Sequence, residues 1–390
     1  MSIDNRKSTA HHSFMAGFVG TFVGVFKDKG VLLMLIIAPI VYGFFYPWPY
    51  QNEVVENIPV GIVDYDKSEL SHNIIRYSNS SPRLSTRSYT SEAQAQQAMW
   101  QGDIAGYLLI PHHIEQDVYA NKPAQVSILG NAGYFLLNKY VQTGFTQAVA
   151  TVSAGIEIKQ QVARGGYAKI ARHNTQAVPL RIDPLFNPSE GYGAYVVPGV
   201  AILILQQTLL MGTALLLGTW AERRLQFASV TGWLGRITAF SVISFSVGCF
   251  YYGWVFDSHG YARGHNMGGT LFFFALYSFT VATLGCVLGM WFRQRERSLQ
   301  ILIFSSLPCF FLSGYPWPVS QLPELLQYVR WIIPATSGIH ASLQLNQMGA
   351  SLSQVVLYFY HLLALLVGFF TVLMLMQYRQ KRRISQGKSV

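Results

Sequence analysis

Few side chains in this sequence could carry out chemistry, and the most suggestive are two adjacent histidines, His112 and His113, which follow Pro111. Histidine is a common metal ligand, so the pair invites a metal-site interpretation. Adjacent residues on a strand or loop point apart, however, and no set of carboxylates or cysteines completes a coordination geometry around them. We therefore do not predict a metal site here.

The sequence Gly387-Lys388-Ser389 matches the end of a phosphate-binding loop. Such a loop requires another glycine five positions earlier and a strand in front of it, but position 382 is arginine and no strand pattern precedes it. We interpret the segment as a basic tail. Because no Walker-type strand ending in aspartate and no catalytic constellation accompanies such a loop, we predict that the chain is not an enzyme and carries no cofactor of its own.

Two short polar segments between apolar runs concentrate charges that could contact a partner protein. The first holds Glu222, Arg223 and Arg224, and the second holds Arg293, Arg295, Glu296 and Arg297. The alternative is that these charges only set the orientation of the neighbouring apolar segments in a membrane. The residues alone leave both interpretations open.

The composition argues against a water-soluble fold. Of the 390 residues, 51% are hydrophobic and only 12% are charged, against roughly 25% in soluble domains. The 22 Tyr, 25 Phe and 8 Trp suit a chain that crosses many membrane surfaces, where aromatic rings collect. The three cysteines, Cys249, Cys286 and Cys309, lie in apolar runs and indicate no disulfide framework.

Six apolar segments approach the roughly 20 residues that a helix needs to cross a bilayer. They are residues 30–46, 195–220, 237–256, 269–292, 299–315 and 355–378. The sequence thus predicts an α-helical polytopic membrane protein with six transmembrane helices. Ahead of them, Phe14, Phe18, Phe22 and Phe26 recur every fourth residue, which predicts an interfacial helix within residues 1–29. The alternative is that this helix simply extends the first span.

The distribution of Lys and Arg predicts that both termini are cytoplasmic. The segments that would lie inside carry Arg6, Lys7, Lys27, Lys29, Arg223, Arg224, Arg236, Arg293, Arg295, Arg297, Arg379, Lys381, Arg382, Arg383 and Lys388. The short outer loops carry only Arg263 and Arg330. This bias accounts for the formal net charge of +10 without a nucleic-acid partner, and none is expected.

Residues 51–190, between the first two spans, are polar enough to form a separate domain, for which we predict an α/β fold outside the cytoplasm. Strands are predicted at 59–63, 84–89, 104–110 and 125–129, and helices at 68–77, 91–101 and 134–163. Ser91 has the character of a helix N-cap and Gly102 that of a helix stop.

The order of these parts resembles a type-2 ABC exporter permease, in the subgroup with a large external domain between the first two spans and multidrug-efflux-like members. The motifs that carry the resemblance are Pro59-Val60-Gly61-Ile62-Val63-Asp64 with Ser68 and Leu70; Gly102, Ala105 and Ile110-Pro111 with Asp117-Val118; Phe186-Asn187-Pro188; and Val197-Pro198-Gly199. A last stretch, Leu312-Ser313-Gly314-Tyr315-Pro316 with Pro323, Leu326 and Ile333-Pro334-Ala335-Thr336, resembles the family's re-entrant hairpin, here residues 316–354.

One departure from the family pattern concerns the cytoplasmic loop at residues 221–236. The family usually carries Glu-Arg-Glu followed by Gly-Thr, whereas this loop begins Ala221-Glu222-Arg223-Arg224-Leu225-Gln226-Phe227. The acidic-basic start is present and the Gly-Thr is missing. The shape of this coupling loop, and the ATPase that it fits, are therefore open.

The resemblance implies a permease subunit that moves an amphipathic, drug-like or lipid-like substrate out of the cytoplasm or inner membrane. ATP and Mg²⁺ would bind a separate cytoplasmic ABC ATPase, coupled through the two charged segments named above. Because Pro198, Pro308 and Pro316 interrupt helices, we predict that they mark the outer end of the pathway or a gate, together with Val197, Gly199 and Gly314. For Pro308 the alternative is an ordinary helix kink. The implied partners are a second permease copy or paralogue, membrane lipids and a periplasmic adaptor, at the bacterial inner membrane, with residues 379–390 as a cytoplasmic tail.

Two other classes of protein are weighed against this hypothesis. A membrane-anchored external binding or scaffold protein needs only one or two spans, whereas five spans follow the polar domain here. A secondary transporter usually has more spans arranged as internal repeats, and the sequence shows no repeat. The absence of Asp, Glu, Lys and Arg from the central parts of the spans, where His361 is the one histidine, also disfavours ion coupling.

Overall fold

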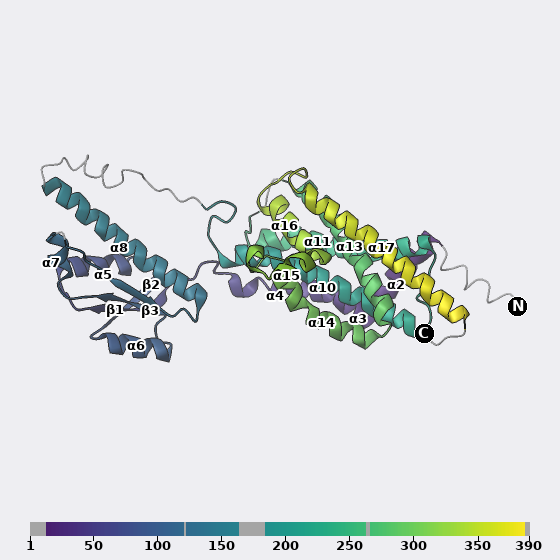
Figure 1. Cartoon of the computed structure of the whole chain (residues 1–390), viewed down its shortest axis with the longest axis horizontal. Helices are drawn as coiled ribbons and strands as arrows, with labels where there is room; N and C mark the ends of the chain where they lie inside the picture. Colours follow the sequence, from purple (N-terminus) through teal and green to yellow (C-terminus); the bar gives the residue numbers. More distant parts are fainter. Residues whose placement is uncertain (1–12, 121, 164–183, 263–265, 387–390) are drawn as a thin grey trace. The chain divides into compact units, whose positions relative to one another are not determined.

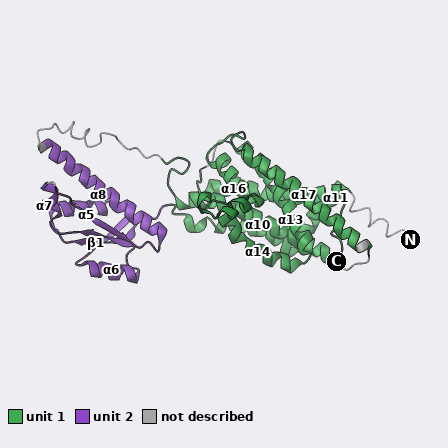
Figure 2. Ribbon diagram, in the orientation of Figure 1, with its two compact units in different colours: residues 1–53, 184–390 green, residues 54–183 purple. Residues whose placement is uncertain are grey.

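The computed structural model describes residues 13–120, 122–163, 184–262 and 266–386. The chain divides into two compact units (Figure 2): unit 1 comprises Met1–Glu53 with Pro184–Val390, and unit 2 comprises Val54–Asp183. Arg6, Lys7, Arg263, Lys388 and the Gly387-Lys388-Ser389 sequence lie outside the described residues.

Within the described residues of unit 1, five helical segments are long and apolar enough to cross a membrane. They are Lys29–Tyr50; Tyr192–Glu222, which is α10; Val230–Ser258, which joins α11 (Val230–Phe250), η3 (Tyr251–Val255) and α12 (Phe256–Ser258); Met267–Phe292, which is α13; and Val356–Arg383 within α17 (Val356–Ser385). Each overlaps one of the predicted spans, so five of the six are confirmed as candidate spans. Figure 1 shows α10, α13 and α17 running alongside one another in unit 1.

The remaining predicted span, residues 299–315, falls in α14 (Arg295–Leu312). The first turn of α14 carries Arg295, Glu296 and Arg297, so its apolar part begins only at Leu299. From there to Leu312 the helix rises about 21 Å, which is short of the roughly 30 Å hydrocarbon core. The sixth span therefore stays a prediction.

The first long segment is not a uniform α-helix. It passes from α3 (Lys29–Leu32) through a π-helical turn, η1 (Leu33–Ile37), into α4 (Ala38–Phe45), and ends in a 3₁₀ turn, η2 (Trp48–Tyr50). Pro39, at the start of α4, has no amide hydrogen to donate to the carbonyl of Leu35. A wider turn at such a position is a common response of a helix to a missing hydrogen bond.

The amphipathic N-terminal helix is separate from the first span. It is α2 (Phe14–Lys27), and Ser13 caps its first turn by accepting from the backbone N–H of Ala16. Asp28 then leaves the helical region, with φ −96° and ψ 107°, so the alternative of one continuous helix is wrong. The predicted aromatic stripe is confirmed: Phe14, Phe18, Phe22 and Phe26 contact one another in succession, with ring centroids 6.3, 6.2 and 5.1 Å apart; the first two pairs are stacked and the last is tilted.

The opposite face of α2 packs tightly against α11 through glycines. A Cβ added to Gly17 would lie 3.1 Å from the Cα of Gly232 and would overlap its carbonyl oxygen. A Cβ added to Gly235 would lie 2.8 Å from the backbone nitrogen of Phe18. The two helix backbones can approach this closely only because side chains are missing from both.

We expect Gly17→Ala and Gly20→Ala, two substitutions in the same helix, to have opposite effects. At Gly17 the new methyl group meets backbone of α11, so α2 must move, at a cost of about 1–3 kcal/mol. At Gly20 nothing lies within 4 Å, and alanine is favoured over glycine in a helix by about 0.5–1 kcal/mol. Thermal unfolding of the purified protein checks this; equal midpoints for the two variants would contradict the close crossing.

Pro198 shapes the first turns of α10. Because proline has no N–H, the carbonyl of Ala194 loses its helical partner. The side-chain amide of Gln347 donates to this carbonyl at 3.2 Å, and the backbone N–H of Ala194 donates to the carboxylate of Glu53 at 3.0 Å. The carbonyl of Glu53 also accepts from Tyr192 N at 2.9 Å, so the start of α10 is tied to two distant segments.

The segment after α14 folds back along α10. It contains η4 (Val319–Gln321), α15 (Glu324–Val329), η5 (Arg330–Ile332), α16 (Pro334–Ser342) and η6 (Leu343–Gln347). The side-chain oxygen of Gln206 accepts from the backbone N–H of Ala335 at 2.8 Å, which satisfies a free donor at the start of α16. Gln206 is about 21 Å along α10 from Tyr192, so this segment reaches the middle of a spanning helix.

Unit 2 is built on a four-stranded sheet in the order β2-β1-β3-β4. The strands are β1 (Ile58–Asp64), β2 (Leu84–Tyr89), β3 (Gly106–Ile110) and β4 (Ser127–Gly130); β1 pairs parallel with β2 and β3, and β4 is antiparallel to β3. The helices are α5 (Glu69–Asn79), α6 (Glu92–Gln101), α7 (Ile114–Tyr119) and α8 (Phe135–Ala163). All four predicted strands are present, with bounds shifted by up to two residues.

Helices cover both faces of the sheet. Alternate residues of each strand point to opposite faces. Leu108 accordingly belongs to the core formed with α5 and α8, while Tyr107 belongs to the core formed with α6. Figure 1 shows α5 and α8 on one side of the strands and α6 on the other. Unit 2 is thus a three-layer α/β unit.

Candidate functional site

Four side chains from three segments of unit 1 meet at the C-terminal end of α10, and we call them the junction: Asp28, Thr219, Glu222 and Arg295. The guanidinium of Arg295 forms a two-pronged ion pair with Asp28, in which Nη2 donates to Oδ1 at 2.8 Å and Nη1 donates to Oδ2. Arg295 Nη1 also donates to Thr219 Oγ1 at 2.8 Å. Its backbone N–H donates to Glu222 Oε1 at 3.0 Å. The junction therefore joins the start of the first span, the end of α10 and the start of α14.

Asp28 has two roles in the junction. Its Oδ1 accepts from the backbone N–H groups of Gly30 and Val31 at 3.0 and 3.2 Å, which caps α3. The same carboxylate binds Arg295. Two glycines make room for the arginine: a Cβ on Gly218 would lie 2.9 Å from the backbone nitrogen of Arg295, and a Cβ on Gly30 would overlap the guanidinium.

The junction is partly screened by solvent. The side chains of Arg295 and Asp28 are 30% and 19% exposed. The hydrogen bond from Arg295 lowers the pKa of Asp28 below its usual value, and the hydrogen bonds from Val31 and Gly30 act in the same direction against the effect of burial. The pKa of Arg295 is raised, chiefly by its hydrogen bond to Asp28. Both groups are therefore charged at neutral pH.

The buried side chain of Arg236 fixes the loop that follows α10. Ser229 caps α11 by accepting from Gly232 N at 3.0 Å, so Arg236 lies within a helix and not in the loop that we predicted for residues 221–236. The Arg236 side chain, only 2% exposed, donates to the carbonyls of Gln226 and Leu225 at 2.6 and 3.2 Å. Its guanidinium also lies 4.6 and 4.8 Å from the ring centroids of Trp220 and Trp233.

The last helix supplies a second anchor for this loop. Gln377 Oε1 accepts from the backbone N–H of Ala228 at 3.0 Å and from the indole N–H of Trp233 at 2.7 Å. Lys381 Nζ lies 5.8 Å from the ring centroid of Phe227. With its inner side occupied in this way, the loop has a fixed shape.

Of the predicted coupling residues, two meet in the junction and the others lie outside it. Glu222 and Arg295 meet in the junction, although the sequence placed them in separate charged segments. Arg223 and Arg224 are exposed on the fixed loop, beside Leu225, which is 46% exposed. Glu296 and Arg297 are exposed on the first turn of α14, and Arg293 caps α13 in the left-handed conformation with φ 57°.

At the opposite end of α10, two of the predicted pathway motifs come together. Val197, Pro198 and Gly199 are buried, and a Cβ on Gly199 would overlap the ring of Tyr315. Tyr195 and Tyr315 stack at 5.1 Å, and each hydroxyl donates to the other residue's backbone carbonyl, with the Tyr195 bond measuring 3.0 Å.

The turn next to Tyr315 is fixed by two basic side chains. Gly314 adopts φ +79°, which favours glycine, and a Cβ there would lie 2.7 Å from Nη1 of Arg330. His340 Nε2 lies 3.0 Å from the carbonyl oxygen of Ser313, and Arg330 is 7% exposed against the ring of Trp331, 4.5 Å away. Pro316 is half-buried in the same turn.

Pro308 is not part of this arrangement. It lies inside α14 and is exposed, among side chains that face outward from unit 1. Of the predicted pathway residues, Val197, Pro198, Gly199, Gly314 and Pro316 thus lie at one end of α10, whereas Pro308 is on the outer surface of a neighbouring helix.

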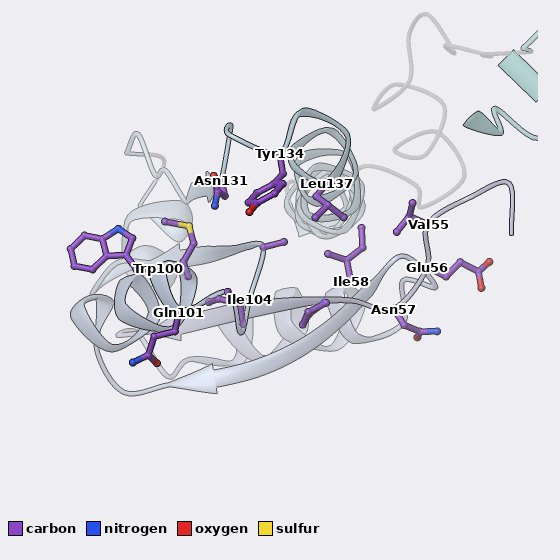
Figure 3. A pocket seen from close by; sticks show the side chains of 14 residues that line it. Val55, Glu56, Asn57, Ile58, Trp100, Gln101, Ile104, Asn131, Tyr134 and Leu137 are labelled. Carbon is purple, nitrogen blue, oxygen red and sulfur yellow. The ribbon is translucent and has the colours of Figure 1, made fainter. Parts of the chain in front are cut away.

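Unit 2 has a cleft of about 570 Å³ at the N-terminal ends of β1 and β3. Figure 3 shows Tyr134 and Leu137 facing Ile58 and Ile104 across the cleft, with Trp100 at its rim. Trp100 is 74% and Tyr134 65% exposed. His112, the residue weighed for metal binding, stacks instead on Tyr65 at 5.2 Å, and no group of three metal-binding side chains occurs in the described part of the chain.

Several residues of the site escaped sequence reasoning. Asp28 is not among the residues predicted for the site, but the order of helix break, aspartate and new apolar run is a helix-start signal that could have marked it. Gln206, inside an otherwise apolar run with Gln207 and Thr208, was also detectable as a polar interruption. Nothing in the local sequence indicates that Asp28 would meet Arg295, because 267 positions separate them.

Comparison with known proteins yields one match. Residues 29–376 match the model of a protein family described as ABC-2 family transporter protein. No curated protein matches the chain significantly. The matched region covers most of the chain, including α10, the start of α14 and the segment that folds back along α10.

Proposed function

Because the chain belongs to the ABC-2 family of transporters, we propose that it is the membrane-spanning permease of an exporter driven by ATP hydrolysis on a separate cytoplasmic subunit. Membership makes it a multi-pass membrane transport subunit of an ABC exporter. The source of energy, the substrate and the remaining partners are the parts that we propose here.

The observation that carries the proposal is the junction. Glu222 and Thr219 lie on α10, whereas Asp28 and Arg295 lie at the starts of the first span and of α14. A displacement of the loop after α10 would therefore be transmitted to both of these helices through the junction. A network of this kind can shift the equilibrium between two arrangements of the three helices. This is what a subunit that converts a push on its loop into helix movement requires.

The exposed surface beside the junction supports docking of an ATPase. Arg223, Arg224 and Leu225 stand on a loop whose inner side is fixed by Arg236 and Gln377. An arginine-rich rim around an exposed apolar residue is typical of a protein-protein interface. A fixed loop transmits force, whereas a loose one would absorb it.

We place the substrate pathway along α10, from the junction to the Tyr195–Tyr315 pair. The close contact of Tyr315 with Gly199 offers a gate at that end. The walls are aromatic and aliphatic, so an amphipathic substrate, drug-like or lipid-like, is the best match. We include α14 as a short sixth span, completed by the turn at residues 313–316 and by the segment that folds back to Gln206.

A second permease, identical or paralogous, would cover the outward face of α14. Ile303, Phe304, Leu307 and Phe311 on this face are 51%, 82%, 63% and 50% exposed. A stripe of this kind at helical spacing fits either lipid or another apolar helix. Six spans per chain would give the twelve of a complete exporter.

We propose a bacterial inner-membrane location with both termini cytoplasmic and with unit 2 on the far side. The basic residues near the junction, against the sparse ones in the outer loops, support this orientation. The cleft with Trp100 and Tyr134 on unit 2 is our candidate contact for a periplasmic adaptor, because exposed Trp and Tyr beside a pocket are typical of binding hot spots.

The test is co-expression with the ATPase encoded beside the permease gene, with purification through a tag on the permease. We expect the two chains to co-elute and to hydrolyse ATP together. Glu222→Ala removes the acceptor for the Arg295 backbone and should reduce hydrolysis about 2- to 10-fold, the equivalent of one net hydrogen bond.

Glu324→Ala is the matched control, because Glu324 is also an exposed glutamate at a helix end but lies on α15, away from the junction. Its hydrolysis rate should equal that of the wild type. A chain that is stable alone and retains no ATPase would overturn the proposal and point instead to a membrane-anchored binding or scaffold protein.

A further inference from the structure

A cavity of unit 1 lies beside the proposed pathway, between α10, α13 and α14, with a volume of about 520 Å³. That size falls in the range of small-molecule sites. Its lining reaches from Arg297 and Trp291 at one end to Ile332, Ile333 and Pro334 at the other. Between Arg297 and Cys309, both in the lining, α14 rises about 18 Å, so the cavity runs along more than half of a bilayer's hydrocarbon thickness.

The lining of the cavity is largely apolar and carries its charge at one end only. Apolar side chains form most of the wall, among them Leu210, Leu284 and Leu288. The lining contains no carboxylate, and its one charged side chain is Arg297. Gln206 and Ser305 add neutral polar groups farther along.

Arg297 is available to a ligand. It is exposed on the first turn of α14 and forms no ion pair within the described part of the chain, in contrast to Arg295 two residues earlier, which is occupied by Asp28. Trp291, 67% exposed, lies at the same end of the cavity, where an indole suits the boundary between headgroups and hydrocarbon.

We propose that this cavity binds an anionic amphiphile, with its carboxylate or phosphate at Arg297 and its apolar body along α14. Arginine binds such anions through two parallel hydrogen bonds, and an apolar wall accepts the rest of the molecule. A cationic amphiphile of similar size meets a like charge at the only charged point of the lining and is disfavoured. The inference rests on the proposed transport function, whose substrate class it narrows.

The experiment uses the purified permease in nanodiscs of phosphatidylcholine and two probes, dansyl-undecanoic acid and its methyl ester, which differ in charge but share the apolar body. Fluorescence titration should show the acid binding at least about ten-fold more tightly than the ester, the effect of one charge-assisted contact. Arg297→Gln should remove this difference, and Arg297→Lys should keep part of it.

Two further variants test whether the preference for the acid arises in this cavity or from a general change in the charge or stability of the protein. Lys27→Gln removes an exposed cation from α2, outside the lining, and should leave the preference unchanged. Leu288→Trp fills the cavity and should weaken both probes, with gel filtration confirming that the variant folds. Equal affinity of acid and ester for the wild type, or a preference that survives Arg297→Gln, overturns the proposal.

Two arms identify the source of the ligand. If a resident lipid occupies the site, phosphatidylglycerol in the nanodisc competes with the acid, and ATP does not move the probe. If the site serves transport, the co-purified ATPase drives the acid across vesicles. Co-elution with the ATPase is scored separately, so loss of the anion preference alone leaves the permease assignment standing.

Discussion

Replacing Arg295 with glutamine is expected to slow ATP-driven transport about ten-fold while the permease still assembles with its ATPase. The substitution removes the ion pair with Asp28 and the charge-assisted bond to Thr219. A partly exposed ion pair contributes about 0.2–1 kcal/mol, and the further hydrogen bond to Thr219 adds about 0.5–1.5 kcal/mol, so a ten-fold effect, about 1.4 kcal/mol, lies within the combined range. The lost contact joins three helices. We therefore expect the substitution to lower the rate of ATP-driven transport more than it lowers the free energy of unfolding.

Asp28 allows the capping and ion-pair roles to be separated. The Asp28→Asn variant would keep the cap of α3, because asparagine is among the best N-cap residues, but it would lose the ion pair with Arg295. Asp28→Asn should therefore reduce transport as Arg295→Gln does with a small change in thermal midpoint, and Asp28→Ala should lower both. The double substitution Asp28→Asn with Arg295→Gln should be no worse than either alone.

The matched control is Lys29→Gln, which removes an exposed charge next to Asp28 and should leave transport unchanged. The pH dependence gives a further check. Because Arg295 lowers the pKa of Asp28 from 3.8, the stabilising contribution is present above about pH 4 and is lost as the pH falls through the lowered value. Additive losses in the double variant, or a strong effect of Lys29→Gln, would remove the junction from the mechanism.

Gln206→Leu is expected to destabilise the protein by about 1–3 kcal/mol, whereas Gln207→Leu, at the next position, is expected to be neutral or stabilising. Gln206 Oε1 accepts from Ala335 N at 2.8 Å, so leucine leaves a buried backbone donor at the start of α16 without a partner. Gln207 is 5% exposed, and within the described residues its amide has no partner stronger than the nearby thiol of Cys309, which is a weak hydrogen-bonding group. Leucine there therefore removes the cost of burying an amide and loses at most one weak contact.

Thermal unfolding in detergent distinguishes the two substitutions, because both replace a buried glutamine of α10 with the same residue. Gln206→Glu adds a further test: its protonated carboxyl restores an acceptor for Ala335, so it should recover part of the stability lost in Gln206→Leu at low pH, where the buried side chain stays neutral. If the two leucine variants unfold at the same temperature, the segment after α14 is not anchored at the middle of α10.

Unit 2 was largely readable from sequence because its signals are local. Ser91 caps α6, and Gly102 ends it with φ +84°, as the capping pattern predicts. β2 runs from Leu84 to Tyr89 as predicted. The predicted start of β3 at Ile104 is two residues early, although Ala105 N still donates to Pro59 O at 2.8 Å, so the difference concerns where the ladder is counted to begin.

The candidate site was less predictable because its contacts are not local. Charge patterns located Glu222 and Arg295, but which of the charged residues meet depends on how α10 and α14 pack. The inward turn of Arg236 was missed for the same reason: arginine near a membrane surface usually sets topology, whereas this one binds carbonyl oxygens of the preceding loop. Pro308 was grouped with the gate only because prolines break helices.

The capping of α10 by Glu53 has a consequence for how such a chain can change over generations. Residue 53 is the last of unit 1 before unit 2, and it is hydrogen-bonded to Tyr192 and Ala194, where the chain has returned to unit 1. Hydrogen bonds within unit 1 therefore hold the points where the chain leaves for unit 2 and returns from it next to each other. A recombination event that deletes or exchanges unit 2 needs only a short bridge between neighbouring points and leaves the order of the helices intact, which makes unit 2 a replaceable module.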